Sequence, residues 1–70
     1  MIMLMRVRDA KVGQVIETCD HYNGLPTGNI YKIGYETECG RILAYSYYTR
    51  THITLHPLVR CRILDPTLLG

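Results

Sequence analysis

The amino-acid sequence predicts a single small all-β domain, folded as a compact barrel-like sheet. Three observations support this prediction. Short runs along most of the chain alternate apolar and polar residues, which is the period-2 pattern of a half-buried strand. Glycine, proline and asparagine cluster between these runs, as they do in turns. No segment of ten or more residues has apolar residues at helical spacing, so no helix of that length is expected.

The first half of the chain is expected to form two strands and one long loop. Ile2–Arg8 begins apolar on both faces and then alternates, which predicts a strand. Asp9–Gly13 follows as a turn, because its final glycine tolerates positive φ. Gln14–Cys19 is rich in β-branched residues and is predicted to be the second strand. Asp20–Asn29 collects several strand breakers and forms the longest irregular stretch, so this loop is a natural place to look for function.

The second half is expected to begin with a hairpin. In the strand Ile30–Tyr35, alternation places Tyr31, Ile33 and Tyr35 on one face, and Glu36–Gly40 is the turn that follows. The remaining elements are expected at Arg41–Tyr48 (strand), Thr49–Thr51 (turn), His52–Leu55 (strand) and Val59–Leu64 (strand). Five or six short strands with tight turns predict a small SH3-like or OB-like barrel over residues 1–66, followed by a tail at 67–70.

Length and composition limit what such a domain does alone. A chain of 70 residues has room for one domain and buries only about 60% of its unfolded surface, so its stability margin is small. It contains no Phe or Trp, and all its aromatic residues are its six tyrosines. Because a small core benefits from a partner, we expect a homo-oligomer. The net charge of +2 is too small to indicate nucleic-acid binding by itself.

Cysteine usage and the N-terminal residues indicate a reducing compartment. The odd number of cysteines (Cys19, Cys39 and Cys61) is unlike the even count of a secreted disulfide framework. The apolar run Met1–Met5 is shorter than a signal-peptide core of about 7–15 residues. No stretch approaches the ~18 apolar residues of a membrane span. We therefore expect a cytoplasmic protein with no membrane partner.

Two segments resemble those of a known class of proteins. The segments are Lys11-Val-Gly-Gln-Val-Ile16, near the start of the chain, and Ile53–Leu64, near its end. Together they resemble the corresponding parts of small SH3-like β-barrel proteins that bacteriophages and other mobile elements encode. The resemblance implies this fold and a viral context, with the host cytoplasm as the location. It supplies no catalytic residues.

Metal-site and catalytic patterns are weak, so we expect neither a cofactor nor enzymatic activity. His52 and His56 have the spacing of zinc ligands, but on a strand they lie about 13 Å apart at ~3.3 Å per residue. Cys19 with His21 has no second ligand pair. No nucleophile elbow, zinc-protease, Walker-type or dinucleotide-binding motif is present.

The candidate binding residues are tyrosines and arginines. The segment Tyr45–Arg50 combines rings that stack on bases with a cation for phosphate, and the neighbouring strand adds tyrosines and Lys32. The full candidate set is Tyr22, Tyr31, Tyr35, Arg41, Tyr45, Tyr47, Tyr48, Arg50, Arg60 and Arg62. The same tyrosines also suit a core or a subunit interface, and paired arginines often form a solvated face.

Two functional hypotheses follow. The first is a non-catalytic module that self-associates and binds a host protein through tyrosine-rich surfaces and exposed strand edges. The second is a protein that binds or sequesters an anionic ligand, such as a signalling nucleotide or single-stranded nucleic acid. In a viral context either activity fits a counter-defence role.

Overall fold

The computed structural model describes residues 5–64, which form six strands and one short 3₁₀ helix. The elements are β1 (Met5–Arg6), η1 (Val7–Asp9), β2 (Val15–Cys19), β3 (Pro26–Glu36), β4 (Ile42–Ser46), β5 (Thr51–Leu55) and β6 (Arg60–Leu64). The prediction of an all-β fold is confirmed. The expected end of the domain at residue 66 and the tail at 67–70 lie outside the described residues.

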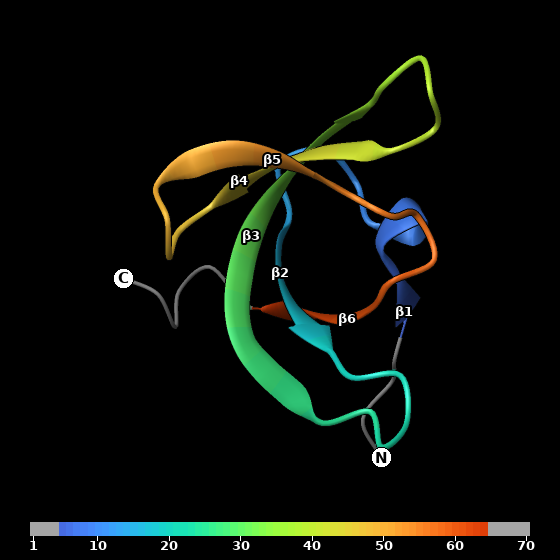
Figure 1. Ribbon diagram of the computed structural model, residues 1–70, viewed down its shortest axis with the longest axis vertical. Helices are drawn as coiled ribbons and strands as arrows, with labels where there is room; N and C mark the ends of the chain where they lie inside the picture. Colours follow the sequence, from blue (N-terminus) through green and yellow to red (C-terminus); the bar gives the residue numbers. More distant parts are fainter. Residues whose placement is uncertain (1–4, 65–70) are drawn as a thin grey trace.

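The strands form one antiparallel sheet in the order β1-β6-β2-β3-β4-β5. Strands β2 to β5 are neighbours in sequence order, and β6 returns to pair with β2 on the other side. The long strand β3 curves strongly, so the sheet wraps around its inner face (Figure 1). Within residues 5–64, β1 and β5 are the two ends of the sheet and do not pair with each other. Closure into a barrel therefore stays a prediction.

The core lies on the concave, inner face. Its buried members are Val7, Ile16, Ile33, Ile42, Ala44, Leu55 and Cys61. In β4 the alternation is regular: Ile42, Ala44 and Ser46 are buried on this face, and the residues between them point outward. Met5, near one end of the sheet, and Ile53, at the other end, pack against the same cluster. One core thus joins both ends of the sheet.

The first strand ends earlier than the sequence predicts. Of the expected strand Ile2–Arg8, residues 2–4 lie outside the described part, and the chain leaves the sheet at Val7 to form η1. The Val7 backbone N–H donates to the Val59 carbonyl at 2.9 Å, and the Ala10 N–H donates back to the Val7 carbonyl at 3.1 Å. Val7 is fully buried, so packing of this side chain competes successfully with extension of the strand.

The predicted loop Asp20–Asn29 is also too long, because β3 already begins at Pro26. Pro26 pairs with Cys19, and Ile30 pairs with Glu17. Three residues of β3 therefore lie opposite one residue of β2, forming a wide bulge that contains Gly28 at φ +86°. Breakers that suggest a loop in the sequence are here accommodated inside a strand.

The β4–β5 hairpin differs in its turn. The strand expected to reach Tyr48 ends at Ser46, and residues 47–50 form the turn in place of 49–51. The Arg50 N–H donates to the Ser46 carbonyl at 2.8 Å, and Arg50 adopts a positive φ of 58°. This conformation ends the turn and starts β5 one residue earlier than predicted.

Candidate binding groove on the outer face

A row of side chains crosses the outer face of the sheet. The registers pair Val15 with Lys32, Lys32 with Tyr45, and Tyr45 with His52. Directly opposed residues in neighbouring strands point to the same face. The row therefore runs from β2 to β5, with the aromatic pair at the β5 end and the lysine beside it.

A second bulge in β3 adds Tyr35 to this face. Ile33 pairs with Ala44 and Glu36 pairs with Ile42, so β3 has one residue more than β4 in this stretch. The extra residue reverses the alternation, and Tyr35 points outward and is 66% exposed. The prediction that Tyr31, Ile33 and Tyr35 share one face is wrong for Tyr35 because of this bulge.

Gly34 is required where the two strands approach. A Cβ at this position would lie 2.9 Å from the carbonyl oxygen of Leu43, closer than such atoms come in proteins. Gly34 thus lets the backbones of β3 and β4 approach at the bulge. An interior glycine in a strand pattern is the sequence signal for such a feature.

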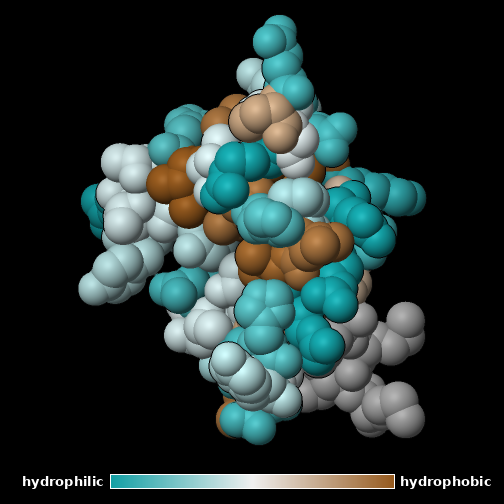
Figure 2. Space-filling view, turned by 45° about the vertical axis from the view of Figure 1, so that its right-hand side comes forward, coloured by the Kyte–Doolittle hydropathy of each residue, from teal (hydrophilic) through white to brown (hydrophobic). Residues whose placement is uncertain are grey.

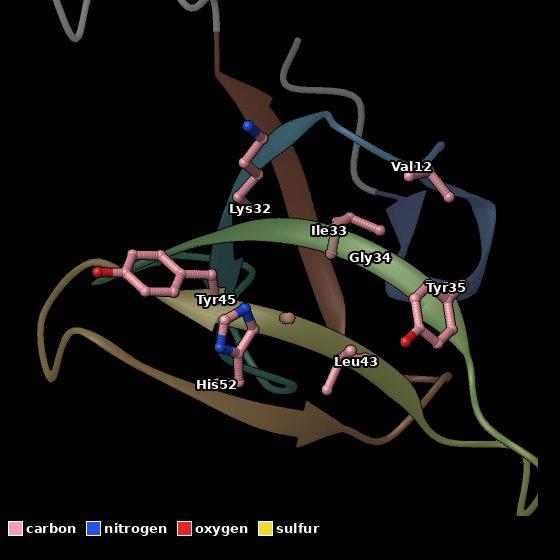
Figure 3. Close-up of a pocket in the computed structure, with 9 residues that line it drawn as sticks. Val12, Lys32, Ile33, Gly34, Tyr35, Leu43, Tyr45 and His52 are labelled. Carbon is pink, nitrogen blue, oxygen red and sulfur yellow. The ribbon is translucent and has the colours of Figure 1, made fainter.

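Val12 forms the remaining wall of a groove. The chain before β2 is held against β3 by two hydrogen bonds, from the Gly13 N–H to the Ile33 carbonyl (2.7 Å) and from the Ile33 N–H to the Gln14 carbonyl (2.8 Å). The groove has a volume of about 260 Å³, and its side chains include Val12, Lys32, Tyr35, Leu43, Tyr45 and His52. Tyr45 and His52 lie at one end, Tyr35 and Val12 at the other, and Leu43 between them (Figure 3).

Tyr45 is held in place by aromatic neighbours. Its ring contacts His52 at a centroid distance of 5.2 Å and Tyr47 at 5.4 Å, both edge to face. Such pairs contribute about 0.5–1.5 kcal/mol beyond area burial. The ring therefore offers a partner a fixed apolar surface at small entropic cost.

The other candidate tyrosines are dispersed. Tyr31 lies on the inner face and packs against the core. Tyr22 is 94% exposed in the loop before β3, and Tyr48 is 84% exposed in the β4–β5 turn. The structure thus brings Tyr35, Tyr45 and Tyr47 together on one face and leaves the other three apart.

The candidate arginines do not line the groove, and two of the four, Arg41 and Arg62, have side-chain partners in the protein. The Arg41 guanidinium donates to the Thr54 hydroxyl at 2.9 Å and to its carbonyl at 3.3 Å. Arg60 pairs with Arg6 at the β1 end of the sheet. Arg50 is exposed at the end of the β4–β5 turn.

Arg62 forms an ion pair with Glu17 on the face of β2 and β6. Two of its nitrogens donate to Glu17 Oε1, Nη2 at 2.6 Å and Nε at 3.0 Å. The second oxygen of Glu17 accepts the Gly28 backbone N–H at 2.9 Å. The Glu17 side chain is 10% exposed and that of Arg62 36%. This arginine therefore stabilises the wide bulge of β3.

The three cysteines are free and differ in environment. Burial raises the pKa of the Cys61 thiol to about 11, and burial likewise raises the pKa of Cys19. Cys39 is exposed, and a hydrogen bond with the Thr37 hydroxyl, followed by one with the Arg41 backbone, lowers its pKa. Within residues 5–64, no group of three or more His, Cys, Asp or Glu side chains is placed to hold a metal ion.

Sequence reasoning did not name six of the groove residues as binding residues: Val12, Ile33, Gly34, Leu43, Ala44 and His52. Val12 and Leu43 are ordinary apolar residues in sequence, and only the bulge and the backbone bonds at Gly13 bring them together. Elsewhere on the surface, exposed apolar residues are interspersed with polar ones, and Figure 2 shows a small apolar area bordered by polar residues on one face.

Searches against protein-family models, curated proteins and solved structures found no match to this chain. The resemblance to small viral SH3-like proteins, with the origin that it implies, stays a prediction. Across residues 5–64, no helix has the length and apolar character needed to cross a membrane.

Proposed function

We propose that this protein is a non-catalytic binding module whose outer groove receives a segment of a partner protein. The observation that carries the proposal is the Tyr45 ring, which His52 and Tyr47 hold at one end of a groove that Leu43 and Val12 also line. Fixed aromatic residues in apolar depressions are typical centres of protein interfaces.

The charges of the groove define the partner further. Among its lining side chains, Lys32 is a cation and none is acidic. Lys32 lies directly beside Tyr45 in the cross-strand row. We therefore propose a partner segment that carries an aromatic or aliphatic side chain next to a carboxylate.

An anionic ligand such as a nucleotide is the second candidate, and the same lysine favours it. The positions of the arginines favour a protein partner instead. Arg41 and Arg62 are hydrogen-bonded within the protein, and Arg60 lies at the β1 end of the sheet. A ligand of high charge would meet one lysine in the groove, whereas phosphate sites usually gather several donors.

The SH3-like barrel also belongs to this proposal. Its support is the strand order, in which β6 returns to β2 after the meander β2 to β5, and the single core that residues from both ends of the sheet share. The closure we propose is through side chains and leaves the backbone edge of β5 unpaired. A solution structure with side-chain contacts across the gap between β1 and β5 would test it.

Selection from a displayed library of random peptides tests the groove. We expect enriched peptides to place an acidic residue adjacent to an aromatic or aliphatic one, and to lose about tenfold or more in affinity on Tyr45→Ala, a loss of about 1.4 kcal/mol. Val12→Asp gives an independent test, because Val12 is 70% exposed and its replacement adds a repelling charge without disturbing the core.

Tyr48→Ala is the matched control, because this tyrosine is exposed and does not line the groove. Peptides that bind Tyr45→Ala and Val12→Asp as well as the native chain would refute the proposal. A panel of nucleotides and oligonucleotides in a thermal-shift assay tests the second candidate. A thermal shift that a nucleotide or oligonucleotide causes, and that Lys32→Ala abolishes, would favour an anionic ligand over a protein partner.

A further inference from the structure

Strand β5 ends the sheet with a complete and regular strand. Its five residues, Thr51–Leu55, all pair with β4 in one unbroken register. Within residues 5–64 no strand pairs with its other side. The backbone groups of an antiparallel edge strand that point away from the sheet remain available for another strand.

This edge has few of the features that prevent strand pairing. Natural edges are protected by charges, prolines, bulges or short length. Thr51–Leu55 contains no Lys, Arg, Asp or Glu, no proline and no glycine, and its register has no bulge. One side chain, Arg41, reaches Thr54 near one end of the strand. The opposite edge is different, because β1 ends at Arg6 and the chain turns directly into η1.

We propose that β5 pairs antiparallel with β5 of a second copy of this chain, across a two-fold axis at Ile53. Such a pair is self-complementary, because the same edge serves both copies. In this register Thr51 of one copy lies opposite Leu55 of the other, and His52 lies opposite Thr54. The strand is rich in β-branched residues, which favour cross-strand packing.

The two ends of β5 support a second copy as the occupant. Before β5, the turn formed by residues 47–50 exposes Tyr48 by 84% and Tyr47 by 44%. After β5, the turn that leads to β6 exposes Leu58 by 42%. Antiparallel pairing brings the turn before β5 of one copy next to the turn after β5 of the other. The exposed tyrosines of one copy thereby lie next to Leu58 of the other, and the two-fold axis repeats this contact at both ends of the paired strands.

The dimer also sets how the two grooves are arranged relative to each other. The proposal of the dimer and the proposal of the groove do not depend on each other. His52 lines the groove and belongs to β5, so pairing joins the outer faces of two sheets with one groove on each side of the seam. A five-residue ladder is a small interface, and we expect association at micromolar concentration.

Sedimentation analysis over a range of concentrations provides the first test. The native chain should form dimers reversibly. Thr54→Lys, which places a charge on the exposed edge, should shift the monomer–dimer transition to at least about tenfold higher concentration. Asn29→Lys is the charge-matched control, because Asn29 is exposed on β3 and away from β5. A monomer at all concentrations, or a dimer that Thr54→Lys leaves unchanged, would overturn the proposal.

Cysteine cross-linking tests the register independently of affinity. In a Cys39→Ser background, Ile53→Cys should form a disulfide-linked dimer under mild oxidation. Thr51→Cys should not, because the two copies of residue 51 would lie about 13 Å apart along the strands at ~3.3 Å per residue, too far for a disulfide. Cross-linking at residue 51 without cross-linking at 53 would exclude this register. Peptide binding by the Thr54→Lys monomer separates failure of the dimer from failure of the groove.

Discussion

Removal of the Arg62 guanidinium should destabilise the protein more than neutralisation of its partner Glu17. The Glu17 carboxylate is 10% exposed and accepts hydrogen bonds from Arg62 and from the Gly28 N–H. Arg62→Ala leaves this carboxylate charged and poorly hydrated. Glu17→Gln removes the charge and keeps one accepting oxygen, which can serve either Arg62 or the Gly28 N–H but not both.

The expected magnitudes follow from the exposure of the two side chains. Loss of one partner from a fully buried pair costs about 3–5 kcal/mol. The Arg62 side chain is 36% exposed, so its removal admits some water to Glu17, and we expect a loss of about 2 kcal/mol. Glu17→Gln should cost about 1 kcal/mol, from the loss of one accepting oxygen and of charge assistance in the hydrogen bond that remains. The double variant should cost about 1.5 kcal/mol, because Gln leaves no unpaired charge.

Urea unfolding provides the measurement. With no tryptophan in the chain, tyrosine fluorescence and far-ultraviolet circular dichroism are the suitable signals. A loss of about 2 kcal/mol corresponds to about 8–16 °C in Tm for a domain of this size. Two results would refute the reasoning: an Arg62→Ala variant within about 0.5 kcal/mol of the native chain, the range of ordinary surface substitutions, or full additivity in the double variant.

Three further predictions concern single sites. Gly34→Ala should cost about 1–3 kcal/mol in urea unfolding, because its Cβ would meet the Leu43 carbonyl at 2.9 Å; a neutral result would mean that the bulge relaxes freely. Iodoacetamide at neutral pH should label one cysteine in the folded chain, the exposed Cys39 with its lowered pKa, and mass spectrometry after Cys39→Ser should find no labelled site. The Asn23 backbone N–H lowers the pKa of Asp20 below 3.8, so the carboxylate stabilises its loop above that pH and the effect disappears as the pH falls through the lower, folded-state pKa. Amide-proton chemical shifts of the loop should follow this titration in the native chain and not in Asp20→Ala.

Much of the fold was predictable from the sequence because it depends on local signals. The strands β2, β4 and β6 follow the alternation of β-branched and polar residues, to within one or two residues at their ends. The turn after Glu36 was predicted from its glycine, and Gly40 adopts the expected positive φ of 84°. These features need no knowledge of what the chain packs against.

The errors arise where tertiary packing overrides the local pattern. The Asp20–Asn29 segment contains breakers that normally end a strand, but the Glu17 carboxylate accepts the Gly28 N–H and lets β3 continue through them. The face of Tyr35 could not be predicted by counting, because one extra residue near Gly34 reverses the alternation. Arg62 resembles a phosphate ligand in sequence, and its partner lies 45 positions away along the chain.

The two bulges of β3 have different roles: the one at Gly28 contributes to stability alone, and the one at Gly34 contributes to stability and to the binding groove. This difference is testable. The bulge at Gly28 is held by the ion pair between β2 and β6, on strands that contribute no side chain to the groove. The bulge at Gly34 turns Tyr35 outward and admits Leu43 to the same surface. Arg62→Ala should therefore lower the free energy of unfolding while the folded fraction binds selected peptides with native affinity. Gly34→Ala should weaken both stability and peptide binding. Equal loss of binding in the two variants, corrected for folded fraction, would mean that the sheet transmits strain between the bulges.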